Sequence, residues 1–158
     1  MRIQLARTLS KRAASELVYL HDLWVGGAAP NRAKQLLDTL RNRMSDPASV
    51  QTVAARLDGS SINVYRALLA KPGNAAHFDE IRNAVSSKGM SATGVRVALA
   101  ELVQVGLAAN VSTRNAGHTS SLWGVPAELA QAATRANRQG PAPFELLTLT
   151  GWLMTHFQ

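Results

Sequence analysis

Three helical patterns and two short apolar runs follow one another in residues 60–125, SSINVYRALLAKPGNAAHFDEIRNAVSSKGMSATGVRVALAELVQVGLAANVSTRNAGHTSSLWGV. Apolar residues recur three and four positions apart in 62–71, 76–89 and 91–106, which is the spacing of one face of an α-helix. Ser91 suits the N-cap of the third helix, and Gly106 suits its end. The inward faces predict a core of Ile62, Tyr65, Leu68, Leu69, Phe78, Ile81, Val85, Val95, Leu99, Leu102 and Val103.

The pattern changes after Gly106. LAANVST and SLWGV read as two short strands, and the intervening RNAGHTS contains the turn formers Asn115 and Gly117, so a β-hairpin is predicted. The second and third helices are joined by KGMS, a short glycine-containing turn typical of helix-turn-helix units. Three helices followed by a hairpin predict a winged helix over residues 59–127 of a mainly α protein.

The first third of the chain predicts further helices. Apolar spacing indicates one helix over 7–24, which ends at the paired glycines of VGGAAP. Asn31 is a good N-cap for a second helix that runs to Met44. A third helix follows within 45–57, capped by Ser45 or Asp46, with Pro47 at its first position. The tetrapeptide DGSS, residues 58–61, is predicted to be a turn before the winged helix.

Two more helices are predicted after the hairpin. Pro126 opens the first of them, which GPAP ends, and the last runs from about Pro143 to Gln158. The last helix has so much apolar surface that we expect it to pack on the body or to form a homodimer with a second chain. The sequence thus divides into a helical region 1–58, a winged helix 59–127 and C-terminal helices 128–158.

The charge is uneven along the chain. The net charge is +7, and residues 1–45 contribute +5 of it, whereas 46–105 and 106–158 contribute +1 each. Such a balance favours polyanionic partners, and with a winged helix it favours double-stranded DNA. We expect contacts from basic or polar residues of the N-terminal helices, the third winged-helix helix with its preceding turn, and the wing. These are Arg32, Lys34, Arg41, Arg43, Lys88, Ser91, Thr93, Arg96, Arg114, His118 and Thr119.

The segment ELVYLHDLWVGGAAPNRAKQLLDTLRNRM, residues 16–44, resembles a SAP-type DNA-binding unit, a helix, a glycine-containing loop and a second helix. The resemblance rests on Gly26, Gly27, Lys34, Leu36, Leu37 and Leu40. Followed by SDPASV and by a winged helix that runs into VPAELAQA, this order resembles the accessory region N-terminal to the motor of some bacterial superfamily-two DNA helicases, over about residues 8–135. The resemblance implies a DNA-binding accessory role beside a separate ATPase or helicase.

Catalysis and metal binding find little support in the sequence. There is no cysteine, and the four histidines are far apart, so we expect no metal or other cofactor. Asp79 and Glu80 lie at the start of a helix, where acidic residues favour the helix dipole. No serine stands in a strand-to-helix elbow, and no Walker A loop occurs. We therefore expect a protein that is not an enzyme.

The residues leave three functions open. The first is a DNA-binding accessory protein whose contacts go mainly to the phosphate backbone. The second is a transcriptional regulator that binds an operator as a dimer, and the third is a protein-docking module without nucleic-acid contact. No apolar run is long enough to cross a membrane and the N-terminus lacks the apolar core of a secretory signal, so a cytoplasmic location is expected.

Overall fold

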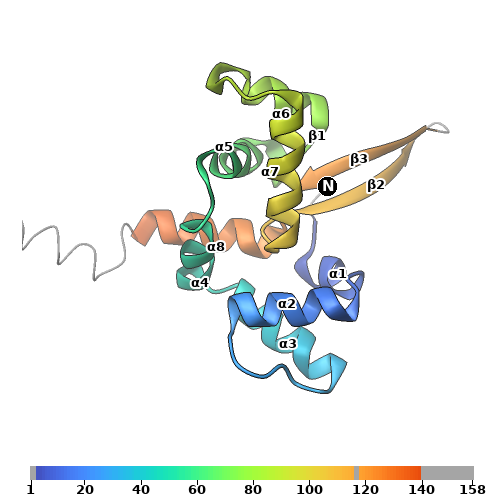
Figure 1. The fold of residues 1–158 in the computed structure, drawn as a ribbon, viewed down its shortest axis with the longest axis vertical. Helices are drawn as coiled ribbons and strands as arrows, with labels where there is room; N and C mark the ends of the chain where they lie inside the picture. The colour runs from blue at the N-terminus through green and yellow to red at the C-terminus, as the bar shows by residue number, and fades with distance from the viewer. Residues whose placement is uncertain (1–2, 116–117, 140–158) are drawn as a thin grey trace, which may run out of the picture.

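The computed structural model describes residues 3–115 and 118–139. It is mainly helical, with one small antiparallel sheet (Figure 1). Its elements are α1 (Leu5–Ser10), α2 (Ala14–Trp24), α3 (Ala33–Met44), α4 (Pro47–Ala54), α5 (Gly59–Ala70), η1 (Pro72–Asn74), β1 (Ala75–His77), α6 (Phe78–Ala84), η2 (Ser86–Lys88), α7 (Ala92–Gln104), β2 (Ala109–Asn115), β3 (His118–Gly124) and α8 (Ala127–Gln139). The predicted last helix, from about Pro143 to Gln158, lies outside the described residues, and so does the homodimer contact expected of it.

The sheet has the strand order β1-β3-β2, with both pairs antiparallel. A hairpin of β2 and β3 is present as predicted, but its strands take in Arg114, Asn115 and His118–Ser120, which were predicted to be loop. The prediction of helix from Ala76 onward is wrong at its first two residues. A left-handed turn at Gly73 and Asn74, with φ of 68° and 57°, brings the chain back beside β3. The Val125 amide then donates to the Asn74 carbonyl at 2.9 Å, which fixes the short strand against its partner.

The single helix predicted over 7–24 is two helices. Ala13 has an extended backbone, with φ −66° and ψ 156°, and separates α1 from α2. The break lets α1 pack against α3 and α8, while α2 packs against α3 and α4. Tertiary packing of the two helices in different directions therefore overrides a continuous helical pattern.

Local capping explains the starts of most other helices. Asp46 caps α4 by accepting from the Ser49 amide at 3.0 Å, and Ser91 caps α7 by accepting from the Gly94 amide at 3.0 Å, as predicted. The predicted DGSS turn is wrong because Asp58 accepts from the Ser61 amide at 2.8 Å and α5 begins at Gly59. This hydrogen bond also lowers the pKa of the Asp58 carboxyl.

The N-cap predicted at Asn31 is wrong as well. The structure places Arg32 at the N-cap of α3, without a side-chain hydrogen bond to the first turn. Extended backbone at Arg32, with ψ of 126°, delays the helix until Ala33.

One apolar core extends through all three regions of the sequence. It contains fully buried leucines of the N-terminal helices, of α7 and of α8, namely Leu20, Leu40, Leu99, Leu102 and Leu129. Two backbone contacts tie the start of the chain to the start of α8, because Ala127 donates to the Ile3 carbonyl at 2.7 Å and Leu5 donates to a Glu128 carboxylate oxygen at 2.9 Å. The N-terminal helices and the hairpin are consequently held in a fixed relation.

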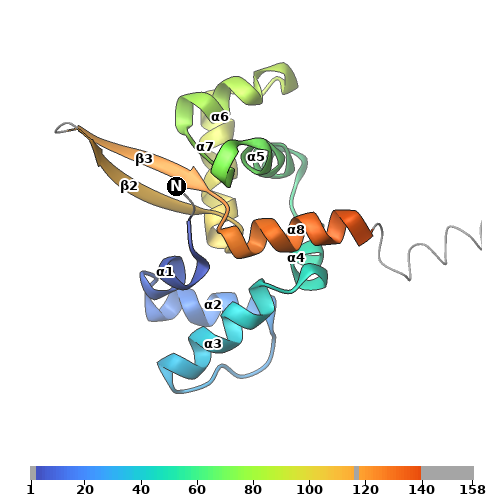
Figure 2. The same ribbon diagram turned by 180° about the vertical axis from the view of Figure 1, so that it is seen from behind.

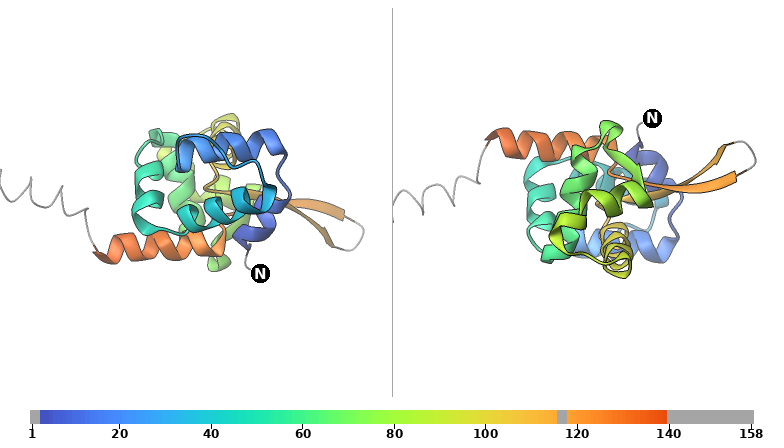
Figure 3. Two further views of the ribbon diagram at one scale, coloured as in Figure 1. Left: turned by 90° about the horizontal axis from the view of Figure 1, so that it is seen from below. Right: turned by 90° about the horizontal axis from the view of Figure 1, so that it is seen from above.

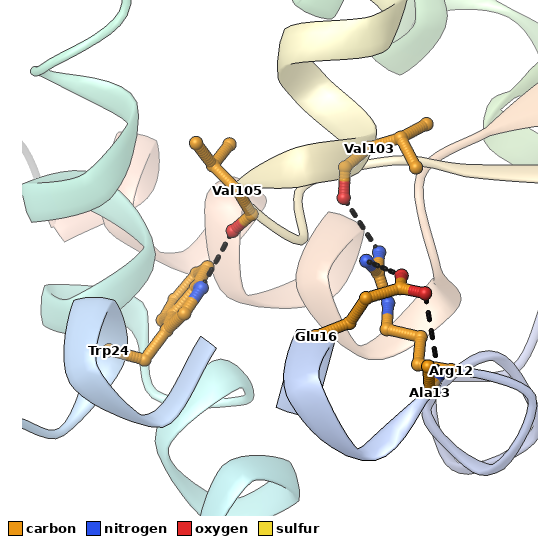
Figure 4. Close-up of polar contacts among 6 residues, drawn as sticks. All are labelled: Arg12, Ala13, Glu16, Trp24, Val103 and Val105. Atoms are coloured by element: carbon orange, nitrogen blue, oxygen red, sulfur yellow. Dashed lines mark hydrogen bonds and ion pairs between the residues drawn. The ribbon is translucent and has the colours of Figure 1, made fainter. Parts of the chain in front are cut away.

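The C-terminal end of α7 docks on the N-terminal helices (Figure 4). The Arg12 guanidinium donates to the Val103 carbonyl at 2.8 Å, and the Trp24 indole donates to the Val105 carbonyl at 2.7 Å. The Trp24 contact gives a partner to a carbonyl at the end of the helix, and the Arg12 contact is a second hydrogen bond to a carbonyl that also accepts from the Gly106 amide at 3.2 Å. Burial lowers the pKa of the Arg12 guanidinium, and Glu16, 3.6 Å away, acts in the opposite direction.

The described elements spread along one long axis. In Figures 1 and 2, α6 and the N-terminal end of α7 lie at one end of this axis, and α2 and α3 lie at the other. Figure 3 shows the hairpin of β2 and β3 projecting to one side of the body while α8 extends to the other. The start of α7 is therefore remote from α3, whereas the end of α7 lies beside the N-terminal helices.

Candidate nucleic-acid interface

The side of α7 that faces away from the core forms a continuous exposed stripe. Four residues of α7 are exposed on one face, namely Thr93, Val97, Ala100 and Gln104. The last three follow Thr93 by four, seven and eleven positions, which is the spacing of one side of a helix. The opposite side carries the buried residues Val95, Ala98, Leu99 and Leu102. Burial of one face thus fixes which residues of α7 meet solvent, and we call Thr93, Val97, Ala100 and Gln104 the α7 stripe.

Arg96 lies beside the α7 stripe and is held in place by an aromatic ring. Its guanidinium carbon lies 5.0 Å from the ring centroid of Phe78, the first residue of α6. This distance is within the range of a cation–π interaction. Because Phe78 packs against the core, the contact restricts an otherwise exposed guanidinium next to the stripe.

The α7 stripe contains no acidic residue. Arg96 and Glu101 are the two charged residues of α7. Glu101 contacts α5, because one of its carboxylate oxygens accepts a hydrogen bond from the buried Ser61 hydroxyl at 2.8 Å. The exposed side of the helix is therefore apolar to weakly polar, with Arg96 at one edge and the half-buried, hydrogen-bonded Glu101 at the other.

The turn before α7 adds a second cation. Lys88 is exposed at the end of η2, and Gly89 adopts a left-handed backbone with φ of 74° that leads the chain toward Ser91. Among the predicted site residues, Lys88, Ser91, Thr93 and Arg96 are brought together at this end of the molecule. Ser91 is also engaged as the N-cap.

The hairpin holds the remaining predicted residues of the winged helix. In the β2–β3 register, Arg114 is opposite Thr119 and Asn115 is opposite His118. These positions lie at the far end of the hairpin, which projects beside α7 in Figure 1. The strand register fixes where their backbone lies on the hairpin. Nearer the body, His77 Nδ1 of β1 lies 3.1 Å from the carbonyl oxygen of Ser121 in β3.

The basic residues predicted on the N-terminal helices form a separate surface. Arg32, Lys34, Arg41 and Arg43 are all exposed, at the start and along the length of α3. Lys34 and Arg41 share one face, and Asp38 lies between them. In Figure 1 α7 is near the viewer and α3 lies partly behind α2, and Figure 2 reverses this order. The predicted site residues therefore occupy two surfaces.

A third group of cations surrounds a shallow cavity of about 370 Å³ between α5 and the end of α6. Arg66, Lys71 and Lys88 line it together with Asn63 and small apolar residues. Lys71 and Lys88 follow the ends of α5 and α6, where positive side chains offset the negative end of the helix dipole. Stabilisation of the two helix ends is therefore enough to explain the positions of these lysines. The sequence does not predict Arg66 or Lys71 as site residues.

Val97 is the residue of the α7 stripe that the sequence reasoning missed. The helical spacing predicts Ser91, Thr93, Arg96 and Ala100 as outward residues of the third helix, and Val97, directly after Arg96, is not among them. Its position four residues after Thr93 is the signal that identifies it.

Metal binding and membrane insertion can be assessed for the described residues. Within residues 3–115 and 118–139, no three His, Asp or Glu side chains come together in a way that suits a metal ion. Over the same ranges, no helix combines the length and the apolar character needed to span a membrane.

Comparison of this chain with protein-family models, with curated proteins and with solved structures finds no match.

Proposed function

We propose that residues 59–127 form a winged helix and that the protein is a non-catalytic accessory protein that binds double-stranded DNA. The order α5, β1, α6, α7, β2, β3, with a three-stranded sheet of order β1-β3-β2, supports this proposal. In a helix-turn-helix unit, the second helix of the motif enters the major groove. In this chain that helix is α7.

The observation that carries the proposal is the acid-free outer face of α7 beside a projecting hairpin. Arg96 supplies positive charge at the edge of that face, Lys88 is exposed in the turn that leads into α7, and Thr93, Val97 and Ala100 on the face are short. An α-helix with its side chains is about 10–12 Å wide and the major groove is about 12 Å wide, so a helix with short outward residues fits deeply. Thr93 then faces the groove, and we expect the phosphate contacts to come from Ser91 and from the end of the hairpin that holds Arg114, His118 and Thr119.

Affinity in this arrangement comes mainly from the phosphate backbone. Each phosphate that a Lys or Arg neutralises releases condensed counterions, so binding weakens as salt rises. The basic surface of α3 adds attraction that is independent of sequence, through Arg32, Lys34, Arg41 and Arg43. A separate ATPase as partner remains a prediction from the helicase resemblance.

The test is an anisotropy titration of a labelled random duplex at several salt concentrations, with single-stranded DNA and RNA of the same sequence as competitors. We expect duplex DNA to compete best and log K to fall linearly with log salt, by about 0.9 for each phosphate contact. Absence of duplex binding at low salt, or an affinity that salt does not change, would refute the proposal and favour a protein-docking module.

The regulator hypothesis is separated from this proposal by its dependence on sequence. A dimeric regulator would bind one palindromic site far more tightly than random duplex, and its two copies would contact half-sites about one helical turn apart. The accessory protein is expected to bind random duplexes with similar affinity.

A further inference from the structure

Val97 is unusual for its exposure. Its side chain is 63% exposed in the middle of α7, which makes it the most exposed large apolar residue in the part of the chain whose burial is described. The residues on either side of it in the α7 stripe, Thr93 and Ala100, are exposed as well. Together they give solvent a row of methyl groups along the outer face of the helix.

Folding does not require an apolar residue at this position. Val97 is directed away from the core that Val95, Leu99 and Leu102 form on the other side of α7. A β-branched residue is also slightly less favourable in a helix than lysine or glutamate, which commonly occupy exposed helical positions. The valine at this position is therefore free to serve a contact with a partner, and its surroundings indicate which partner fits.

The surroundings of Val97 fit the major groove of DNA. Arg96 brings positive charge to one edge of the α7 stripe, and Lys88 precedes α7 in the chain. The four residues of the stripe include no carboxylate, and Glu101 at its other edge accepts a hydrogen bond from the Ser61 hydroxyl. The groove exposes one apolar group that side chains recognise, the 5-methyl group of thymine. Short apolar side chains are the type that contacts this methyl group.

We propose that Val97, which lies between Thr93 and Ala100 on the α7 stripe, contacts a thymine 5-methyl group in the major groove and gives the protein a preference for thymine-containing duplexes. This inference rests on the proposed function, because it needs α7 to lie in the groove. It adds a specific ligand group and a specificity-determining residue. The preference is modest, because one buried methyl group changes affinity by roughly fourfold.

The test compares two duplexes of about 15 base pairs that differ only at the 5-position of the pyrimidines. One contains thymine, and the other contains deoxyuridine at every thymine. The wild-type protein is expected to bind the thymine duplex roughly threefold to tenfold more tightly, as expected for one or two methyl contacts. In a second pair, 5-methylcytosine in place of cytosine restores a methyl group at the same groove position and should raise affinity.

The chain offers a matched control for the variant. Val97→Ser should abolish the difference between thymine and deoxyuridine duplexes, whereas Val97→Thr keeps one methyl group and should retain part of it. Val18→Ser changes a valine on α2 that is 51% exposed and lies outside the proposed interface. This control should retain the wild-type difference, and circular dichroism checks that all three variants remain folded.

The possible results distinguish this inference from the proposed function. Equal wild-type affinity for thymine and deoxyuridine duplexes overturns methyl recognition while duplex binding stands. A difference that survives in Val97→Ser also overturns it, since another residue must then sense the methyl group. Absence of binding to either duplex refutes the proposed function and this inference with it.

Discussion

The α7 end and the α3 end of the molecule both display exposed cations, but they display them differently. On α3, Lys34 and Arg41 share a face with Asp38, so a carboxylate lies in the middle of the basic surface. Beside the α7 stripe, Arg96 is held over the Phe78 ring and no carboxylate intervenes. The α3 surface has more positive charge, whereas the α7 surface has a shape that suits a groove.

Under the proposed function, the surface that contacts the duplex is therefore not the surface with the largest excess of positive charge. The N-terminal third contains most of the excess charge, but its helices lie at the opposite end of the long axis from the start of α7. We therefore expect the α7 end to hold a short duplex and the α3 end to contribute a weaker, separate attraction.

The junction between the two ends gives the largest expected effect. Gly106 follows α7 with a φ of 85°, and a methyl group there would lie 2.8 Å from Met44 Cε and 3.0 Å from Leu20 Cδ2. Gly106→Ala should lower the free energy of unfolding by about 3 kcal/mol, because left-handed strain and crowding add together. Urea denaturation followed by circular dichroism measures this change.

Gly89→Ala is the matched control for the junction. Gly89 has a φ of 74°, but no atom lies within 4 Å of the added methyl group. Its replacement should cost only the backbone strain, about 1 kcal/mol. Equal losses in the two variants would show that Gly106 does not pack closely against α2 and α3, and that the two ends are not rigidly joined there.

The next largest effect contrasts equal charge changes at the two ends. Lys88→Ala with Arg96→Ala should weaken binding of a 15-base-pair duplex by about tenfold, since both cations flank the proposed groove contact. Lys34→Ala with Arg41→Ala should weaken it less than about threefold, on all sequences alike. Fluorescence anisotropy at low salt gives both values, and the reverse order would place the duplex on α3, as the charge distribution alone predicts.

The smallest effect concerns the core beneath the α7 end. The Tyr65 hydroxyl is buried without a hydrogen-bond partner among the described residues. Tyr65→Phe should therefore raise the free energy of unfolding by up to about 1 kcal/mol at neutral pH, with no change in duplex affinity. A loss of stability on this replacement, seen in thermal denaturation, would mean that the hydroxyl has a favourable contact.

The same tyrosine predicts a dependence on alkaline pH. Burial raises the pKa of Tyr65 from 10.0 to about 12, so the folded protein retains a proton that the unfolded chain releases. The stability that this group contributes is complete below pH 10 and falls by about 1.4 kcal/mol per pH unit between 10 and 12. The difference between wild type and Tyr65→Phe isolates this effect from other groups that titrate in the range.

Helix type and capping were predictable where they depend on neighbouring residues. Asp46 and Ser91 each cap the helix that follows, because a short acceptor side chain reaches an amide three residues ahead. The hairpin was also predictable from Asn115 and Gly117 between two β-prone runs. Local chemistry is enough in these cases.

Features set by distant partners could not be read from the sequence. Strand β1 has three residues, too few to show a period of two, and it depends on β3 for its hydrogen bonds. The break between α1 and α2 depends on how each helix packs in the core. The separation of Lys34 from Lys88 depends on the packing of the whole chain, which charge counts do not contain.

Lysine footprinting tests the location of the duplex most directly, because the four lysines of the chain are spread over the molecule. Lys88 is exposed beside the start of α7, Lys34 is exposed on α3 and Lys11 is exposed after α1. Limited acetylation with and without a saturating 15-base-pair duplex, read by mass spectrometry, reports the protection of each. We predict that the duplex slows labelling of Lys88 severalfold and leaves Lys34 and Lys11 unchanged. Protection of Lys34 with unchanged labelling of Lys88 would contradict this account.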